Sequence, residues 1–350
     1  MKRLAIILMA AMCLISCNSK KTIKALLPNV SGKAGEVLVV IDKEKWDGDL
    51  GDAIRGLLAD ECPWLAQSEP LYTLVNVAPG GFADLFKVHR NIVIVNVDPQ
   101  ASKEGVAISN DVWAAPQIVL QLSAFTDEGA AKVVADEAQL MTSALEQAER
   151  DRVIRNTMLY EERELYTQAS SIFGGAPHFP TGYKLKKATE DFIWIADERQ
   201  YTNQSIVMYR YPATGDPQKD LSEDAIRAHR NEVMMYNIPG MFENTYVTTS
   251  EIGAFTTESI RYQGRAFVQT RGFWEVENDF MGGPFVSVSR VDEKNQRVVV
   301  AETFLFAPNK QKGPTLRKYE AALYTLRLPD ELDLDKFQYN LDEIILNPED

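Results

Sequence analysis

The densest run of chemically capable side chains lies at residues 271–285, where carboxylates, aromatic rings and glycines follow one another. On a β-strand, Glu275 and Glu277 point to one face and Trp274 points to the other, because side chains alternate. Two such carboxylates lie about 7 Å apart, within the range of roughly 6.5–9.5 Å found in inverting glycosidases. The segment therefore allows a general acid and base among Glu275, Glu277 and Asp279.

A structural interpretation explains the same residues equally simply. Strand alternation alone produces a solvent-facing acidic strand edge opposite a core tryptophan. We therefore treat Trp274, Glu275, Glu277 and Asp279 as candidate ligand-binding residues and assign no catalytic residue. The glycines that follow predict a tight turn in which Gly282 or Gly283 has a positive φ.

The usual catalytic and cofactor motifs do not occur in the sequence. No glycine recurs at i+2, which excludes a Gly-x-Gly nucleotide turn, and no Gly-x-Ser-x-Gly motif is present. His89, His178 and His229 are too widely spaced for a local zinc motif. The acidic run at residues 47–52 does not have a glycine or a distal glutamate at the spacing of an EF-hand calcium loop, which favours helix capping. We expect no cofactor and no metal.

The N-terminus carries the most specific signal in the chain. Lys2 and Arg3 precede an apolar run from residue 4 to residue 15, the arrangement of a secretory signal peptide. Residues 14–17 (Leu-Ile-Ser-Cys) resemble the lipobox of bacterial lipoproteins, which implies a signal peptide at 1–16 and acyl chains on Cys17. The alternatives are an ordinary cleaved signal and an uncleaved anchor. By the same resemblance, Asn18 in place of an aspartate is compatible with transfer to the outer membrane. Lys20 and Lys21 lie where some lineages have acidic surface-export residues, which favours the periplasmic face.

Charge and cysteine content narrow the class of protein further. Without Lys2 and Arg3, the mature chain has 35 basic and 50 acidic residues and a net charge of −15. Nucleic-acid binding requires clustered basic residues, so we expect no nucleic-acid partner. With Cys13 removed and Cys17 lipidated, only Cys62 remains, and we expect it to be a buried, unreactive thiol.

The elements of the first half predict a layered α/β arrangement. We predict that residues 17–35 form a tether. Residues 36–173 are predicted to form an N-terminal α/β half with a long helix. Its β-branched runs predict buried strands at 36–42, 71–77, 91–97 and 117–124. A helix is expected at about 49–60, and helical spacing from 127 to 170 predicts one very long helix or two in tandem.

The second half, 174–328, predicts an antiparallel sheet with helices. Strands are expected at 192–196 and 205–211, then a helix at 223–237. A meander of three long strands follows at 258–276, 285–291 and 297–306, and a closing helix at 315–326. Residues 329–350 form an acidic tail. We predict an α+β fold: two sheet-and-helix halves joined by a long helix, the second containing the meander.

Residues 278–285 (Asn-Asp-Phe-Met-Gly-Gly-Pro-Phe), preceded by Phe273-Trp274-Glu275, resemble the family known as domain of unknown function 4837. Residues 63–70 and 90–92 add to the likeness. The resemblance runs over nearly the whole mature chain, and it implies that the protein is a bacterial lipoprotein. It carries no established activity, so it assigns no catalytic residue.

We therefore expect a membrane-anchored envelope lipoprotein that acts by binding or scaffolding. Its expected partners are the membrane, through the N-terminal lipid, and an envelope protein or glycan. The alternative is an envelope glycan hydrolase that uses Glu275, Glu277 or Asp279. A deep cleft exposing two of these carboxylates beside an aromatic surface would favour the enzyme, and an open convex face would favour binding.

Overall fold

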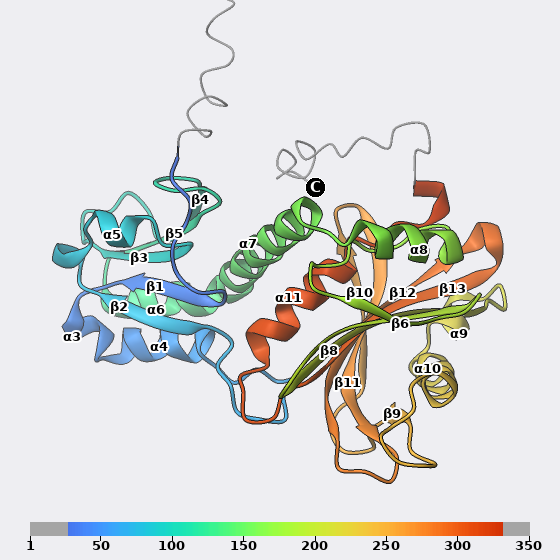
Figure 1. Cartoon of the computed structure of the whole chain (residues 1–350). Helices are drawn as coiled ribbons and strands as arrows, with labels where there is room; N and C mark the ends of the chain where they lie inside the picture. Colours follow the sequence, from blue (N-terminus) through green and yellow to red (C-terminus); the bar gives the residue numbers. More distant parts are fainter. Residues whose placement is uncertain (1–26, 332–350) are drawn as a thin grey trace, which may run out of the picture. The chain divides into compact units, whose positions relative to one another are not determined.

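A computed structural model describes residues 27–331 (Figure 1). The signal peptide, Cys17, the first part of the tether and residues 332–350 of the acidic tail lie outside the described residues. The chain divides into two compact units. Within the described residues, one unit comprises 27–60 and 70–149, and the other comprises 61–69 and 150–331. The mixed helix and sheet content confirms the α+β class.

The N-terminal unit is built on a five-stranded sheet in the order β2-β1-β3-β5-β4. Four of these strands are parallel, and β4 pairs antiparallel with β5 at one edge. Its elements are β1 (Glu36–Val40), α3 (Lys43–Trp46), α4 (Asp49–Leu58), β2 (Thr73–Val77), η2 (Pro79–Gly81), α5 (Asp84–Lys87), β3 (Asn91–Val97), β4 (Gly105–Asn110), β5 (Ile118–Ala124) and α6 (Asp127–Asp136).

The four strands expected in this half are confirmed as β1, β2, β3 and β5. Successive residues of β1 enter different cores: Val37 and Val39 pack with one cluster, and Leu38 and Val40 with the other. A strand buried on both faces needs an unbroken apolar run, which made β1, β3 and β5 identifiable in the sequence, whereas β2 lies at the edge of the sheet and is only half-buried. Strand β4 was missed because its Gly-Val-Ala-Ile-Ser-Asn sequence is short, polar at its end and largely exposed.

The expected long helix at 127–170 is divided into three: α6, α7 (Ala138–Leu159) and α8 (Arg163–Phe173). No proline or glycine marks either break. Glu137 takes a non-helical conformation between α6 and α7, and the backbone N–H of Glu162 bonds to the carbonyl of Phe179 just before α8. The compact units divide at Glu149/Arg150, within α7, and α8 packs into the core of the C-terminal unit.

The C-terminal unit is built on a sheet of eight strands in the order β10-β11-β12-β13-β8-β7-β6, with β9 paired to β11. Its elements after α8 are β6 (Lys184–Ala188), β7 (Phe192–Arg199), β8 (Thr202–Pro212), α9 (Pro217–Asp220), α10 (Glu223–Asn237), β9 (Val247–Thr249), β10 (Thr256–Tyr262), β11 (Arg265–Val276), β12 (Gly282–Asp292), η3 (Glu293–Asn295), β13 (Arg297–Phe306), α11 (Gly313–Leu323) and η4 (Pro329–Glu331).

The meander is confirmed, although its first strand was predicted too long. Residues 258–276 form a hairpin, β10 and β11, which turns at Gln263 and Gly264, both with positive φ. Glycine and a polar neighbour at such φ values are typical of a two-residue hairpin turn. The helix at 223–237 is confirmed as α10, and Ser222 caps it by accepting a hydrogen bond from the Ala225 N–H.

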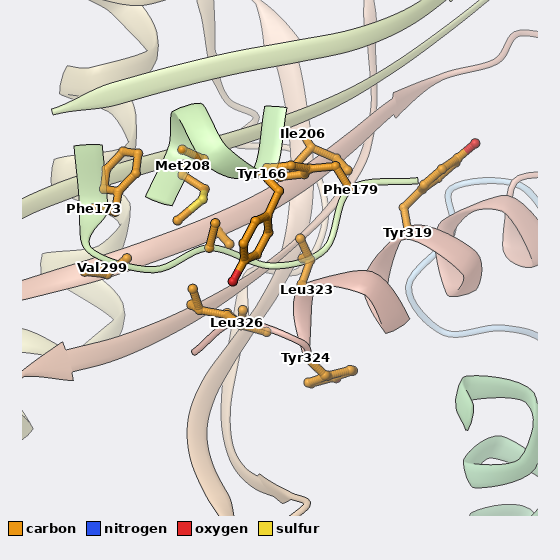
Figure 2. Close-up of a cluster of buried hydrophobic side chains, with 14 of the residues drawn as sticks. Tyr166, Phe173, Phe179, Ile206, Met208, Val299, Tyr319, Leu323, Tyr324 and Leu326 are labelled. Carbon is orange, nitrogen blue, oxygen red and sulfur yellow. The ribbon is translucent and has the colours of Figure 1, made fainter. Parts of the chain in front are cut away.

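Two apolar cores cover opposite faces of this sheet. One contains α8 and α11 residues packed on strands β7, β8, β12 and β13, including Phe173, Met208 and Leu323 (Figure 2). The other contains α10 residues such as Ile226 and Met234. Burial of the sheet on both faces makes it a rigid support for the loops at its ends. Within residues 27–331, no helix is both long and apolar enough to cross a bilayer.

Candidate functional site at the end of the β11–β12 hairpin

The candidate residues lie where β11 turns into β12. Strand β11 ends at Val276, whose N–H bonds to the carbonyl of Met281 at 2.8 Å. Within the turn, the Asp279 N–H bonds to the Val276 carbonyl at 3.0 Å, and Asn278 has a φ of 62°. Glu277 and Asp279 therefore lie in the turn. The strand alternation expected to align Glu275 with Glu277 ends between them.

The expectation of a positive φ at Gly282 or Gly283 is wrong. Both glycines lie inside β12, and the left-handed residue of the turn is Asn278. Close packing explains Gly283 instead, since a Cβ atom there would lie 2.1 Å from the carbonyl oxygen of Leu305. At Gly282, a Cβ atom would lie 2.7 Å from the carbonyl oxygen of Trp274.

Trp274 is a core residue. Its side chain is 3% exposed and packs edge-on against Phe304 with ring centroids 5.3 Å apart. The indole N–H donates to the Leu305 carbonyl at 3.3 Å. A buried indole presents no face to a sugar, so Trp274 acts as the support of the hairpin.

Glu275 is the one candidate carboxylate that remains on the strand. It is half-buried and accepts a hydrogen bond from the Ser250 hydroxyl at 2.6 Å. That bond joins β11 to the segment that follows β9, which is itself paired with β11. Glu275 therefore has a structural partner, whereas Glu277 and Asp279 belong to the surface of the turn.

A second loop, between α10 and β9, lies against the hairpin turn. The Glu277 N–H bonds to the Tyr246 carbonyl at 2.8 Å, and the Asn278 side-chain amide reaches the Asn244 carbonyl at 3.5 Å. Strand β9 continues the contact through its pairing of Val247 with Val276. Residues 240–246 and 277–281 thus form one surface, which we call the tip surface. It adjoins the strands labelled β9 and β11 in Figure 1.

Thr245 holds the first of these loops closed. Its buried hydroxyl donates to the Phe242 carbonyl at 2.6 Å, and its backbone carbonyl accepts from the Gly240 N–H at 2.8 Å. Gly240 packs so tightly that an added Cβ would lie 2.2 Å from the Thr245 hydroxyl oxygen. The loop is therefore locked in one conformation by short-range bonds and by contact with the core.

Three large apolar side chains project from the tip surface. Met241 is 81% exposed, Phe242 is 65% exposed, and Phe280 is fully exposed at 105%. Single exposed apolar residues are ordinary, but clusters of them mark interaction sites. The sequence offered one overlooked signal, since Met241 and Phe242 follow Pro239-Gly240 outside any periodic apolar run.

The charged groups of the tip surface are all acidic. Glu243 is exposed, and Glu277 and Asp279 are half-buried. Segments 240–246 and 277–281 contain no Lys, Arg or His. The surface thus combines three apolar side chains with three carboxylates on rigid loops. It can bind a ligand, but it brings together no pair of an acid and a base.

The remaining titratable candidates have structural roles. Burial raises the pKa of the Cys62 thiol, which disfavours its reactive thiolate form. His89 lies between Glu36 and the Asn91 carbonyl, and His178 bonds to Glu161. In the described part of the chain, no three His, Cys, Asp or Glu residues are arranged to hold a metal ion.

The acidic run at 47–52 lies at the start of α4. Gly48 is the N-cap residue and no side chain caps the helix, so the expected aspartate cap is absent from this position. Asp49 and Asp52 lie in the first turn, where carboxylates interact favourably with the helix dipole. A cavity of about 890 Å³ opens beside this turn, lined by lysines and carboxylates alike. Carboxylates outnumber lysines in its lining, and Lys45 is paired with Asp127 across it.

Comparisons with known proteins identify families without a known activity. Residues 162–325 match the family described as Domain of unknown function (DUF4837), and residues 30–158 match a second, Domain of unknown function (DUF8532). The DUF4837 match covers only residues 162–325, whereas we expected it to cover nearly the whole mature chain. Residues 63–70 and 90–92, which contributed to the resemblance, lie in the segment that matches the second family.

Solved structures give only a distant likeness. The chain is similar to the Ran-binding protein Mog1p of Saccharomyces cerevisiae, with 10% identity and a TM-score of 0.29, over 44% of this chain and 89% of that one. A mutant of protein Mog1 gives the same identity and TM-score over 43% and 89% of the respective chains. No curated protein matches significantly. The resemblance to the DUF4837 family is thus confirmed for residues 162–325, which contain the β11–β12 hairpin.

Proposed function

We propose that this protein is a bacterial envelope lipoprotein, held on a membrane by acyl chains on Cys17, that binds a partner through the tip surface. The observation that carries the binding role is the exposure of Met241, Phe242 and Phe280 on loops that are fixed by hydrogen bonds. Exposed aromatic and methionine side chains are enriched in binding interfaces. Rigid loops lose little conformational freedom on binding.

The geometry gives less support to a glycan hydrolase. Trp274 is buried and Glu275 is bonded to Ser250, so neither is placed as a glycosidase would require. Glu277 and Asp279 lie in the turn beside the fully exposed Phe280, beyond the end of β11, and are not aligned with Glu275 on one strand face.

The anchor is tested by replacing the lipidated residue in the full-length protein. Cys17→Ala should abolish incorporation of a labelled fatty acid and move the protein from the membrane fraction to the soluble fraction. Cys13→Ala is the control, because Cys13 lies in the part of the signal that is removed. Fatty-acid incorporation that persists in the Cys17→Ala protein would disprove the anchor.

The binding role is tested separately, by a photo-activated cross-linking residue at position 280 in living cells. We expect a discrete adduct that disappears when Met241→Ser and Phe242→Ser are added. The same cross-linker at Leu85, which is 77% exposed in the N-terminal unit, should give no such adduct. Identical patterns from both positions would show that the tip surface has no particular partner.

A further inference from the structure

We infer that the partner of the tip surface is a protein whose docking face combines an apolar groove with a margin of lysine and arginine. This inference rests on the proposed function and adds the chemistry of the partner. It follows from the arrangement of apolar and charged side chains on one rigid surface.

The exposed apolar side chains of the tip surface fit a partner with a concave apolar surface. Phe280 stands at the end of a hairpin and Met241 and Phe242 on the adjoining loop, so all three project beyond the sheet. Projecting aromatic side chains gain binding free energy by entering pockets from which water is expelled. A flat polar face would leave these side chains in contact with water.

The charged residues of the tip surface indicate that the partner's docking face is positively charged. Glu243, Glu277 and Asp279 border the apolar side chains, and neither tip segment contains a basic residue that would neutralise them. A partner with Lys or Arg around its groove gains favourable charge pairs and faster encounter. An acidic partner would bring like charges together.

The same charges disfavour a membrane as the target. Protein surfaces that enter bilayers usually place Lys and Arg beside their apolar residues, because bilayer surfaces carry anionic lipids. All the charged residues of the tip surface are acidic, so their charge is opposite to that of a membrane-binding surface. A protein partner is therefore the better match than a lipid surface.

The loops are prepared for binding. The Phe280 backbone N–H bonds to the Asp279 carboxylate at 2.6 Å, and the Phe242 carbonyl accepts a hydrogen bond from the Thr245 hydroxyl, so the backbone that carries each ring is held in place. Trp274 and Val276 anchor the hairpin in the core beneath them. Asp279 thus has two functions, since it orders the turn and contributes to the acidic border.

The test uses two synthetic helical-hairpin peptides of equal length, each with a Leu-lined groove between its two helices. The groove is bordered by Lys in the Leu/Lys peptide and by Glu in the Leu/Glu peptide, and binding is followed by fluorescence anisotropy. The Leu/Lys peptide should bind saturably, and the Leu/Glu peptide should not. Phe280→Ser with Met241→Ser should weaken binding about 10- to 30-fold, as expected for central interface residues. The single variant Leu85→Ser should leave it unchanged.

Charge specificity is tested with matched triple variants. Glu243→Gln, Glu277→Gln and Asp279→Asn together should weaken the Leu/Lys complex and reduce its dependence on salt. The control is the triple variant Glu190→Gln, Asp224→Asn and Glu258→Gln. It removes the same number of carboxylate charges from exposed positions elsewhere on this unit. Equal effects of the two triple variants would show non-specific attraction and overturn the inference.

Two further outcomes would contradict the inference in distinguishable ways. Tip-dependent binding to vesicles of phosphatidylcholine and phosphatidylglycerol, without peptide binding, would identify a membrane as the target. A cross-link at position 280 in cells combined with no preference between the peptides would leave the binding role intact and refute the basic partner. Absence of that cross-link would refute the binding role itself.

Discussion

Arg230 of α10 and Glu302 of β13 form a bidentate ion pair that is completely buried. The distances are 2.9 Å from Nε to Oε2 and 2.8 Å from Nη2 to Oε1, and both side chains are 0% exposed. Arg230 also donates to Thr249 of β9 at 2.8 Å, and its guanidinium lies 3.9 Å from the centre of the Phe285 ring. This pair therefore ties α10 and β9, the elements flanking one tip loop, to the centre of the sheet.

We predict that Glu302→Leu lowers the free energy of unfolding by about 3–5 kcal/mol, because it leaves a buried guanidinium without its counter-charge. The double variant Arg230→Met with Glu302→Leu should recover most of this loss, since no unpaired charge remains. Chemical denaturation of the three proteins measures both values. Equal stability of the single and double variants would show that the unpaired guanidinium is not the cause of the loss.

We predict that Gly283→Ala destabilises the protein by about 1–3 kcal/mol through overpacking, because its Cβ would lie 2.1 Å from the Leu305 carbonyl oxygen. The matched control is Gly56→Ala in α4, where an added Cβ meets no atom within 4 Å. Alanine should stabilise that helix by up to about 1 kcal/mol. Thermal unfolding of both variants gives the comparison, and equal melting temperatures would contradict the close approach.

Gly283 also illustrates the limit of prediction from sequence. Periodic apolar residues identified most strands and α10, because burial imposes a regular spacing on each element. Position 283 requires glycine because the carbonyl of Leu305, in the neighbouring strand β13, leaves no room for a Cβ atom. Likewise, the breaks at Glu137 and Glu162 have no local helix breaker. Contacts between distant segments decide such positions, and a single sequence does not contain them explicitly.

The candidate site was predicted in part. The sequence located the acidic hairpin but placed Glu275 and Glu277 on one strand face, because the end of β11 at Val276 has no distinct signal. Met241 and Phe242 were missed, since only the pairing of β9 with β11 brings their loop to the hairpin. The resulting surface is a property of tertiary structure.

We predict that Glu320 makes stability dependent on acidic pH. Burial disfavours its carboxylate, but Arg271, Arg150 and a hydrogen bond from Tyr324 outweigh burial and hold its pKa below the ordinary value of 4.5. A carboxyl whose pKa is lowered by folding stabilises the protein above its unfolded pKa, and this contribution is lost as pH falls through the folded value.

The measurement is the free energy of unfolding of wild type and Glu320→Gln from neutral pH to below pH 4.5. Wild type should be the more stable at neutral pH, and the difference should shrink as the medium becomes acidic. Glu190→Gln, at an exposed position, should follow the wild-type pH profile. A difference that stays constant over the whole range would contradict this role of Glu320.

We predict that Glu69 stabilises the start of α11. Its carboxylate accepts hydrogen bonds from the backbone N–H groups of Lys312 and Gly313, at 2.8 Å and 2.9 Å respectively. Bonds to a charged acceptor contribute about 1.5–3 kcal/mol, so Glu69→Ala should lower the free energy of unfolding by a similar amount. Ser68→Ala is the control, because Ser68 bonds to the exposed side chain of Glu61. Similar losses in the two variants would argue against the helix-capping role.

The last prediction concerns catalysis. Glu275→Gln and Glu277→Gln should leave the protein folded, membrane-bound and able to form the cross-link at position 280. The glutamine oxygen at 275 can still accept the Ser250 hydrogen bond, and Glu277 lies in an open turn, so each change should alter stability by less than about 0.5 kcal/mol. Under the hydrolase alternative, removing a general acid or base would lower the rate by about 10²–10⁴-fold while folding and binding persisted.

The measurement is turnover of purified cell-wall and polysaccharide fragments by wild type and by each glutamine variant, with Glu190→Gln as an exposed-carboxylate control. We expect no turnover from any of the four proteins. Hydrolysis by wild type and by the Glu190→Gln control that is lost in either hairpin variant would establish a catalytic carboxylate in the β11–β12 hairpin. In that event Glu275 or Glu277 would act on a glycan, and the binding role proposed for the tip surface would have to give way to hydrolysis.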